Sequence, residues 1–256
     1  MDSRPGPTHL RSPRQVPIDH KTTLIGVDPI DTRFLYREIF QANAYGDFDL
    51  GPRALVVDVG ANIGLFTLLV KQRHPDANVL AFEPVPDLAE AMRQNCAARG
   101  LSDVTVHEVA LGAGERHQTQ FTYYPLRPSS STRFPERHER GKAALSSAVP
   151  ERVLRRMYRG RQIHVDMAPL AGYLPGDGPV SLIKIDAVGS ELDILGGIED
   201  RQWPRIRRVL LDIQDIDGRC DAVRARLARV GFDVRVRPTP LAGDGLNLIV
   251  DAIQRG

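Results

Sequence analysis

The sequence predicts an α/β fold in which helices cover both faces of a doubly wound, mostly parallel sheet. Short apolar runs rich in β-branched residues, such as 55–59, alternate with segments of helical periodicity, such as 87–98. This alternation is typical of parallel strands joined by crossover helices. A glycine-containing turn directly follows the first apolar run, at a position where sheets of this kind bind ligands.

A helix is expected before the sheet begins. Asp28 can cap this helix, and Pro29 suits its first turn. Its apolar positions fall near one face: Ile30, Phe34, Leu35 and Ile39. Such a helix could lie across a ligand site or simply pack on the core.

The rest of the chain predicts one interrupted domain. Strands are expected at 55–59, 79–82, 104–109, 181–185 and 209–213, and helices at 63–72, 87–98, 189–195 and 221–230. Proline and glycine residues separate two last strands, 232–236 and 246–250, which predicts an antiparallel hairpin. We therefore expect a flexible tail (1–27), a helical cap (28–54) and one domain (55–256) with an insertion at about 125–161.

Composition and charge exclude several classes of protein. The 34 basic residues nearly balance the 32 acidic ones, and a net charge of +2 gives no case for nucleic-acid binding. Cys96 and Cys220 are isolated, which suits a reducing cytoplasm and argues against a zinc site. The seven histidines lack metal-ligand spacing, so no metal is expected. No apolar stretch reaches membrane-spanning length and no signal peptide is evident, so we expect a cytoplasmic protein without membrane contact.

The turn after the first strand is the first candidate binding site. It runs from Asp58 through Gly60, Ala61 and Asn62 to Gly64, in a G-x-x-x-G spacing. Gly60 allows a tight turn and a close approach by a ligand, and Gly64 allows close packing at the start of the helix. The alternative is an ordinary turn with two glycines. The dinucleotide fingerprint G-x-G-x-x-G is absent, which argues against NAD.

Glu83 ends the second strand, about 20 residues after the glycine turn, where an acid contacts ribose hydroxyls in this architecture. A carboxylate accepts two hydrogen bonds from a cis-diol and repels a 2′-phosphate. The alternative is a solvated acid at a strand end. Together the two signals are stronger than either alone, because one βαβ unit fixes their spacing.

Asp186 ends the fourth strand, beside the point where the strand order reverses. It can hold a substrate, an amino group or a proton. Lys184 lies two residues earlier and faces the same side, where an ion-paired role is expected. Glu191 falls in the first turn of the next helix, where an acid compensates the helix dipole.

Four groups of residues, in this order, resemble the FkbM-type family of S-adenosylmethionine (SAM)-dependent methyltransferases. They are 57–64, Phe82-Glu83-Pro84, 109–112, and 183–186 with Glu191. The resemblance covers roughly 55–195, and the segment around Tyr36 and Arg37 also resembles one that precedes the glycine motif in members from bacterial natural-product pathways.

This resemblance implies a Rossmann-like sheet of seven strands whose last strand is antiparallel, with SAM as cofactor. It implies methyl transfer to an oxygen of a small molecule or sugar in secondary metabolism. In the family pattern, Asp58, Gly60 and Asn62 meet the methionine end of SAM, Glu83 the ribose, and Ala110 and Leu111 the adenine. The expected cofactor-binding residues are Asp58, Gly60, Ala61, Asn62, Gly64, Glu83, Pro84, Ala110, Leu111 and Asp186.

One departure from the family pattern bears on the reaction. Many members read Asp-Val-Glu-Gly where this chain reads Asp-Ala-Val-Gly at 186–189, so Val188 replaces a candidate base. Asp186 is then the expected catalytic base. Two alternatives stay open: an enzyme that cyclises SAM itself and releases methylthioadenosine, and a non-catalytic SAM-fold partner protein.

The acceptor side is predicted from weaker signals. Tyr36, Arg37, Tyr123 and Ser130 are candidate substrate or lid residues, although for Tyr123 packing against the sheet edge is the favoured interpretation. Segments 143–161 and 30–40 are expected to form a lid over the site. The five arginines of 152–161 form either a solvated helix face or a surface for an acidic substrate or carrier. We therefore expect a small-molecule substrate that a carrier could hold, and the oligomeric state stays open.

Overall fold

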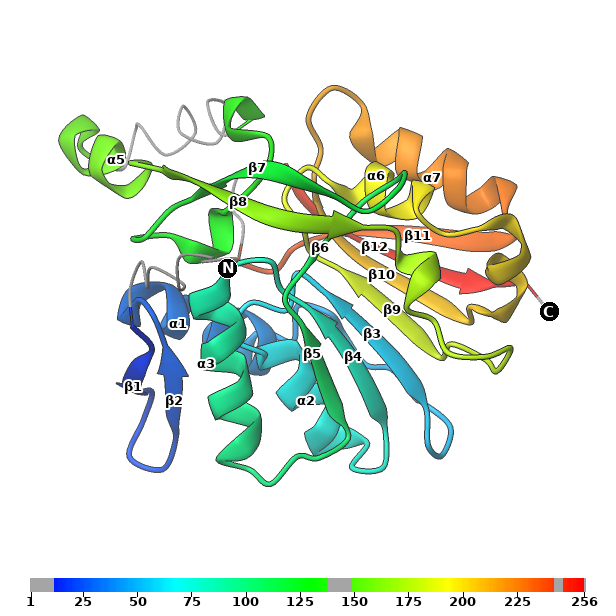
Figure 1. Ribbon diagram of the computed structural model, residues 1–256, viewed down its shortest axis with the longest axis horizontal. Coiled ribbons are helices and arrows are strands. Elements are labelled where there is room, and N and C mark those ends of the chain that lie inside the picture. Colours follow the sequence, from blue (N-terminus) through cyan, green and yellow to red (C-terminus); the bar gives the residue numbers. More distant parts are fainter. Residues whose placement is uncertain (1–11, 138–148, 242–245, 256) are drawn as a thin grey trace, which may run out of the picture.

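The computed structural model describes residues 12–137, 149–241 and 246–255 (Figure 1). Its centre is a seven-stranded sheet of order β11-β12-β10-β9-β3-β4-β5. The strands are β3 (Leu55–Val59), β4 (Asn78–Phe82), β5 (Val104–His107), β9 (Leu182–Ile185), β10 (Arg208–Gln214), β11 (Phe232–Pro238) and β12 (Asn247–Gln254). Strand β12 runs antiparallel to β10 and β11, and the pairs among β5, β4, β3, β9 and β10 are parallel. The predicted mostly parallel sheet with an antiparallel last strand is confirmed.

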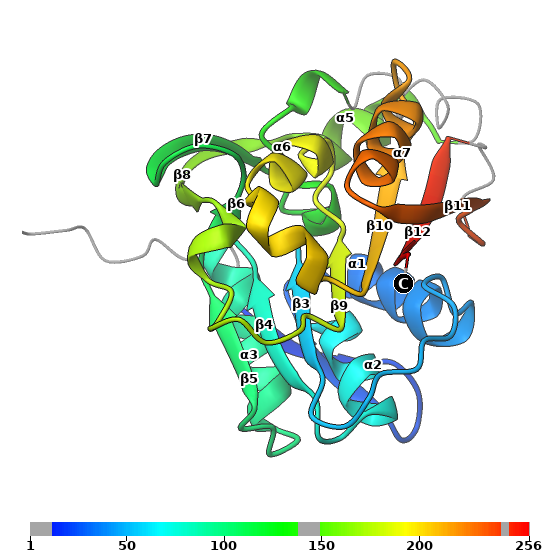
Figure 2. The ribbon, with the colours of Figure 1, turned by 90° about the vertical axis from the view of Figure 1, so that its right-hand side faces the viewer.

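Helices cover both faces of this sheet and bury two cores. One core joins Val56, Leu182 and Leu210 to α2 (Leu65–Arg73) and α3 (Pro86–Ala97). The other joins the alternate strand residues to α6 (Glu191–Gly196) and α7 (Arg219–Arg229). Figure 2 shows α2 and α6 on opposite sides of β3 and β9. The two-residue alternation of buried strands explains this division, because successive side chains point to opposite faces.

The N-terminal segment differs from the prediction of a flexible tail over 1–27. Strands β1 (Arg14–Pro17) and β2 (Thr23–Gly26) pair as an antiparallel hairpin. The Asn95 side chain on α3 fixes this hairpin, because it accepts a bond from Ile25 N and donates to Ile25 O, both at 2.8 Å. The prediction is therefore wrong for 14–26, where a long-range side-chain contact compensates for weak local signals.

The predicted capped helix is present as α1 (Pro29–Tyr36), and Asp28 accepts hydrogen bonds from two amides of its first turn. A π-helical turn, η1 (Arg37–Gln41), continues it. Leu35 and Ile39 are buried as expected. Ile30 and Phe34 instead are 79% and 42% exposed, so only half of the predicted apolar face packs on the core.

A second sheet that the sequence did not predict flanks the insertion. Its three strands, in the order β6 (Ala110–Leu111), β8 (Arg161–Ala168) and β7 (His117–Tyr123), lie above the carboxyl ends of β3 to β5 in Figure 1. The predicted third strand at 104–109 ends at His107, and β6 leaves the large sheet to pair with β8. Exposed and buried residues do not alternate regularly in β7 and β8, so the sequence did not indicate these strands.

The remaining elements are short. They are η2 (Pro128–Ser130), η3 (Pro135–Arg137), α5 (Glu151–Met157), η4 (Leu170–Gly172) and η5 (Asp200–Arg205). Residues 138–148 of the predicted insertion lie outside the described residues. Within the described part of the chain, no helix has the length and apolarity needed to span a membrane.

Candidate active site

A cavity of about 860 Å³ opens at the carboxyl ends of β3, β4 and β9. Several segments far apart in the sequence line it: the glycine turn, the end of β4, β6, the turn after β9, and parts of α1, η1 and 128–133. Of the predicted cofactor-binding residues, eight line the cavity: Gly60, Ala61, Asn62, Glu83, Pro84, Ala110, Leu111 and Asp186. The fold thus brings most of the predicted binding residues to one place.

The glycine turn is shaped by its contact with the turn after β9. Gly60 has a φ of 70°, and a Cβ atom placed there would lie 1.8 Å from the backbone oxygen of Asp186. Only glycine allows this approach of the two turns. The amides of Gly60 and Ala61 both donate to Phe82 O at 3.0 Å, which ties the turn to the end of β4.

Glu83 is 5% exposed, and backbone donors hold its carboxylate at the cavity wall. Oε2 accepts a hydrogen bond from Asn62 N, and Oε1 accepts one from Val85 N, both at 2.9 Å. Burial raises the pKa of Glu83 to about 7, and the two amide donors act in the opposite direction. A carboxylate oxygen has two lone pairs, so each oxygen retains an acceptor site for a hydroxyl group.

Asp58 does not line the cavity, which corrects the expectation that it meets the cofactor. It is fully buried, with Oδ2 accepting from Thr67 Oγ1 at 2.7 Å and Oδ1 lying 3.0 Å from Lys184 Nζ. Lys184 also donates to Gly60 O at 2.9 Å. Asp58 thus fixes the glycine turn through Lys184, and the ion-paired role predicted for Lys184 is confirmed.

Gly64 also lies outside the cavity lining. It has a φ of 88°, and an added Cβ atom would lie 2.7 Å from Cγ of Met92 on α3. This geometry agrees with close helix packing and not with the predicted cofactor contact. Asn62, with a φ of 53°, is the member of the turn that lines the cavity with a polar side chain.

Asp186 faces the cavity with a side chain that is 35% exposed. Its Oδ2 accepts a hydrogen bond from Tyr45 Oη at 3.1 Å and lies 3.9 Å from Lys184 Nζ. Burial and the charge of Asp186 raise the pKa of the buried Tyr45 phenol, which therefore stays a donor. Tyr45 thus orients the carboxylate of Asp186 at the cavity wall.

Two further carboxylates lie beside Asp186, and the sequence analysis missed both. Burial and the charges of Asp186 and Asp31 raise the pKa of Glu38, on η1, to about 7. Burial, then Asp186 and then Glu38, raise the pKa of Asp212, on β10, well above its ordinary value. A signal was available for Asp212, because it is an acid inside the apolar run 209–213, next to the predicted position of Asp186.

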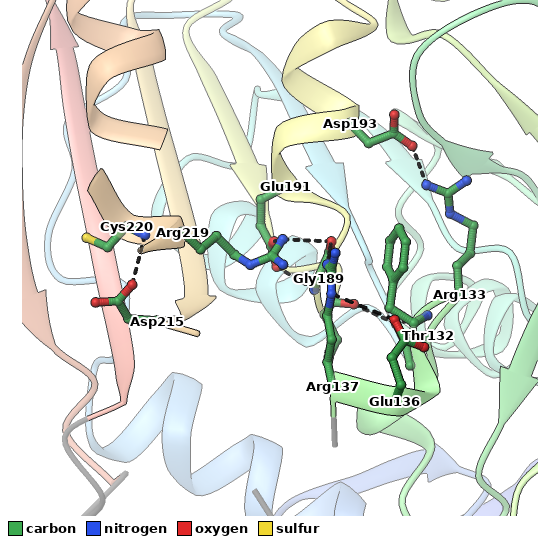
Figure 3. Close-up of polar contacts among 12 residues, drawn as sticks. Thr132, Arg133, Glu136, Arg137, Gly189, Glu191, Asp193, Asp215, Arg219 and Cys220 are labelled. Carbon is green, nitrogen blue, oxygen red and sulfur yellow. Dashed lines mark hydrogen bonds and ion pairs between the residues drawn. The ribbon is translucent and has the colours of Figure 1, made fainter. Parts of the chain in front are cut away.

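A roof formed by 128–133 closes the cavity from the insertion side. Ser129 donates from its amide and its hydroxyl to the Asp31 carboxylate, at 3.1 and 2.6 Å. Thr132 Oγ1 donates to Val188 O at 2.6 Å, and Arg133 pairs with Asp193 on α6 (Figure 3). The roof is therefore fastened both to α1 and to the turn after β9.

The same turn is held on its far side by two arginines. Arg137 and Arg219 both donate to Gly189 O, the latter at 2.8 Å, and Arg219 also pairs with Glu191 at 3.1 Å (Figure 3). Glu191 is fully buried and accepts from Gly189 N at 2.7 Å. Glu191 therefore shapes the turn that carries Asp186, in addition to its place in the first turn of α6.

None of the four residues predicted for the substrate or lid lines the cavity: Tyr36, Arg37, Tyr123 and Ser130. Tyr36 stacks on Phe40 with ring centroids 4.9 Å apart, and Tyr123 is buried in the core. Their neighbours Leu35, Ser129 and Ser131 line the cavity instead. The predicted segments were near the site, but side-chain direction along a helix or turn was not readable from the sequence.

The predicted lid is corrected in the same way. Residues 30–40 contribute Leu35 and Ile39 to the cavity wall, but no described residue of 143–161 lines it. Helix α5 of this segment lies behind the roof, where Tyr158 accepts a hydrogen bond from Arg127 at 2.6 Å. Residues 143–148 of the predicted lid lie outside the described residues. Among the residues that the structure describes, the segment that covers the cavity from the insertion side is 128–133.

Comparison with known proteins identifies the family. The chain matches the methyltransferase FkbM domain over residues 58–234. It is 33% identical over 233 residues to the 31-O-demethyl-FK506 methyltransferase FkbM of Streptomyces tacrolimicus, which covers 86% of this chain and 88% of that protein. It is 30% identical over 211 residues to Methyltransferase 1 of Beauveria bassiana, with 81% and 83% covered.

A solved structure agrees in fold. The methyltransferase FkbM of Methylobacillus flagellatus superposes with a TM-score of 0.51 at 16% identity, over 84% of this chain and 47% of that one. The strand order of the sheet, the cavity at its switch point and the matches in sequence all point to the same family. The chain therefore belongs to the FkbM family and is a SAM-dependent methyltransferase.

Proposed function

We propose that the protein transfers a methyl group from SAM, bound in the 860 Å³ cavity, to a hydroxyl oxygen of a small molecule of secondary metabolism. The observation that carries this proposal is the fixed Glu83 carboxylate at the cavity wall, between the glycine turn and β6. A cis-diol donates two hydrogen bonds to such a carboxylate. The relatives' names support a methyltransferase of natural-product pathways, and one of them names a methylated oxygen.

The residues of the cavity fit SAM in the following way. Gly60, Ala61 and Asn62 border the methionine end, Glu83 takes the ribose hydroxyls, and Ala110 and Leu111 flank the adenine. Asp58 acts from behind the wall, because it holds Lys184 and through it the carbonyl of Gly60.

Bound SAM supplies an electrophilic methyl group with a good leaving group. The protein's task is therefore to orient the acceptor and to exclude water. The roof at 128–133 excludes water, since it joins α1 to the turn after β9. Asp186 takes the proton of the acceptor hydroxyl, because its carboxylate faces the cavity and Tyr45 fixes its orientation.

We also propose that the acceptor reaches the site as a small molecule that an acidic carrier can hold. Helix α5 and the residues after it expose five arginines behind the roof: Arg152, Arg155, Arg156, Arg159 and Arg161. Only Arg155 among them has an acidic partner in the described chain, Glu151. This excess of positive charge suits an acidic partner surface.

Calorimetry with S-adenosylhomocysteine tests the cofactor site without knowledge of the acceptor. Glu83→Ala removes the acceptor of the ribose hydroxyls, so its affinity should fall by about ten- to a hundredfold, or about 1.5–3 kcal/mol. Glu115→Ala is the matched control, because Glu115 is exposed and does not line the cavity. Equal affinity in both variants would reject the ribose assignment.

Incubation with SAM distinguishes methyl transfer from cyclisation of SAM by the product, since cyclisation would release methylthioadenosine.

A further inference from the structure

The position of Asp212 next to Asp186 follows from the pairing of β9 and β10. These strands are parallel, with Leu210 opposite Lys184 and Leu211 opposite Ile185. One residue further along each chain lie Asp212 and Asp186. Neighbouring strands are about 4.8 Å apart, and residues two apart face the same side. The two carboxylates therefore lie side by side on the face that also carries Lys184.

Most of the charged groups that act on Asp212 are acidic. Asp186, Glu38 and Glu191 are acidic, and Lys184 is the base among the neighbours that affect it. Lys184 is already bonded to Asp58 and to Gly60 O.

The acidic residues of this group differ in their hydrogen-bond and ion-pair partners. Glu191 is paired with Arg219, and Asp186 accepts a bond from Tyr45. Within the described part of the chain, no hydrogen bond or ion pair reaches the Asp212 carboxylate.

We propose that Asp186 and Asp212 share one proton and that Asp212 holds it in the resting enzyme, which keeps Asp186 ionised as the proton acceptor. Asp212 is thus a positioning residue that acts through Asp186. This inference rests on the proposed function for the role of the proton, but not for its presence on Asp212.

The asymmetry between the two acids decides where the proton lies. Two adjacent carboxylates in a partly buried site do not both ionise at neutral pH, because their like charges repel. Asp186 has the Tyr45 hydroxyl as donor and Lys184 Nζ at 3.9 Å, and both favour its ionised form. The pKa of Asp212 is raised by burial and by Asp186 and Glu38, in agreement with the geometry.

The protonated Asp212 also gives the reaction a consistent balance. The acceptor oxygen forms a bond to the methyl carbon as the carbon–sulfur bond breaks, and the hydroxyl proton passes to Asp186. Asp212 keeps its own proton throughout the reaction. Before the transfer, the pair of Asp186 and Asp212 therefore carries one negative charge, which is on Asp186.

Infrared spectroscopy of the ligand-free enzyme at neutral pH tests this assignment. The difference spectrum of wild type minus Asp212→Asn should contain the carbonyl band of a protonated carboxylic acid, and the band should shift in D2O. Glu38→Gln is the matched variant, because it removes a neighbouring acid and should leave the Asp212 band in place. Absence of the band from the wild-type minus Asp212→Asn spectrum would show that Asp212 is ionised and overturn the proposal.

Asp186→Asn gives a second measurement that holds even if Asp212→Asn does not fold. Removal of the neighbouring negative charge should lower the pH at which the Asp212 band disappears by about 1 or more. An unchanged titration would overturn the sharing of a proton. These spectra need no SAM, so failure of the Glu83 calorimetry would reject the cofactor site while this result stood.

Discussion

The ammonium group of Lys184 lies 3.0 Å from Oδ1 of Asp58, and both side chains are almost completely buried. Asp58 also accepts a hydrogen bond from Thr67 Oγ1, and Lys184 also donates one to the carbonyl oxygen of Gly60. One buried ion pair thus connects β3, α2, β9 and the glycine turn. Removing one partner of such a pair strands the other charge in the core.

Lys184→Met should therefore lower the free energy of unfolding by about 3–5 kcal/mol, measured by urea denaturation. Asp58→Asn in the same chain should restore part of this loss, because the stranded charge is gone. Lys21→Met serves as control, since Lys21 is exposed. A loss equal to that of the control would mean that the pair contributes nothing to stability.

The contact of Gly60 with Asp186 predicts a position-specific effect of adding a methyl group. Gly60→Ala adds a Cβ atom 1.8 Å from Asp186 O, whereas Gly100→Ala adds one at a similar φ of 65° with nothing within 4 Å. Gly100→Ala should cost about 1 kcal/mol from backbone conformation alone. Gly60→Ala should cost several times more and abolish S-adenosylhomocysteine binding. Similar unfolding curves for the two variants would contradict the close approach.

The binding half of the site was predictable, because its residues are adjacent in sequence to the strand ends that position them. Gly60, Glu83 and Asp186 each follow a buried strand, and the carboxyl ends of parallel strands meet at one edge of the sheet. The direction of each side chain at that edge was not predictable. Asp58 precedes Gly60 by two residues and is buried in the core, although its motif suggested a ligand contact.

The covering half of the site was not predictable, since it depends on contacts between distant segments. Ser129 meets Asp31 across 98 residues, and Thr132 meets Val188 across 56. No periodicity marks such contacts. Strand β8 pairs with β6 and β7, and Thr122 of β7 also bridges to Thr132. The local pattern of β7 and β8 carries little of the alternation that marks a half-buried strand.

The roof contacts predict where ligand binding slows hydrogen exchange. Addition of S-adenosylhomocysteine should protect amides in 128–133 and in 30–40, because Asp31 and Ser129 join these segments over the cavity. Helix α5 should show little change, since it does not line the cavity. Protection of α5 without protection of 128–133 would favour the lid that the sequence predicts over the roof.

The raised pKa of Glu38 predicts a pH-dependent stability. Its folded pKa of about 7 exceeds the ordinary value of 4.5, so the folded state binds more protons between these values. The free energy of unfolding should then fall as pH rises from about 4.5 through 7. Asp31 and Glu83 act in the same direction, with raised pKa values of about 6 and 7.

Glu38→Gln isolates the contribution of this residue, because glutamine resembles the protonated acid. The stability of the variant relative to wild type should increase across that pH window and stay constant below it. Urea denaturation at closely spaced pH values measures the difference. A constant difference across the window would mean that Glu38 titrates normally.

Asp186→Asn distinguishes a base from a ligand of the SAM ammonium group. If Asp186 accepts the proton of the acceptor, the variant should bind S-adenosylhomocysteine within about threefold of wild type but lose about 10²–10⁴-fold in turnover. If Asp186 instead binds the ammonium group, the variant should lose about ten- to a hundredfold in affinity, because S-adenosylhomocysteine retains that group.

Tyr45→Phe should show the same loss of turnover as Asp186→Asn but to a smaller extent, since Tyr45 only orients Asp186. We expect the pattern of the base, because Asp186 lines the cavity and its Oδ2 is already engaged by Tyr45. Methylthioadenosine as the product of wild type with SAM alone would contradict a base at this position, since cyclisation requires a free amine and no acceptor hydroxyl.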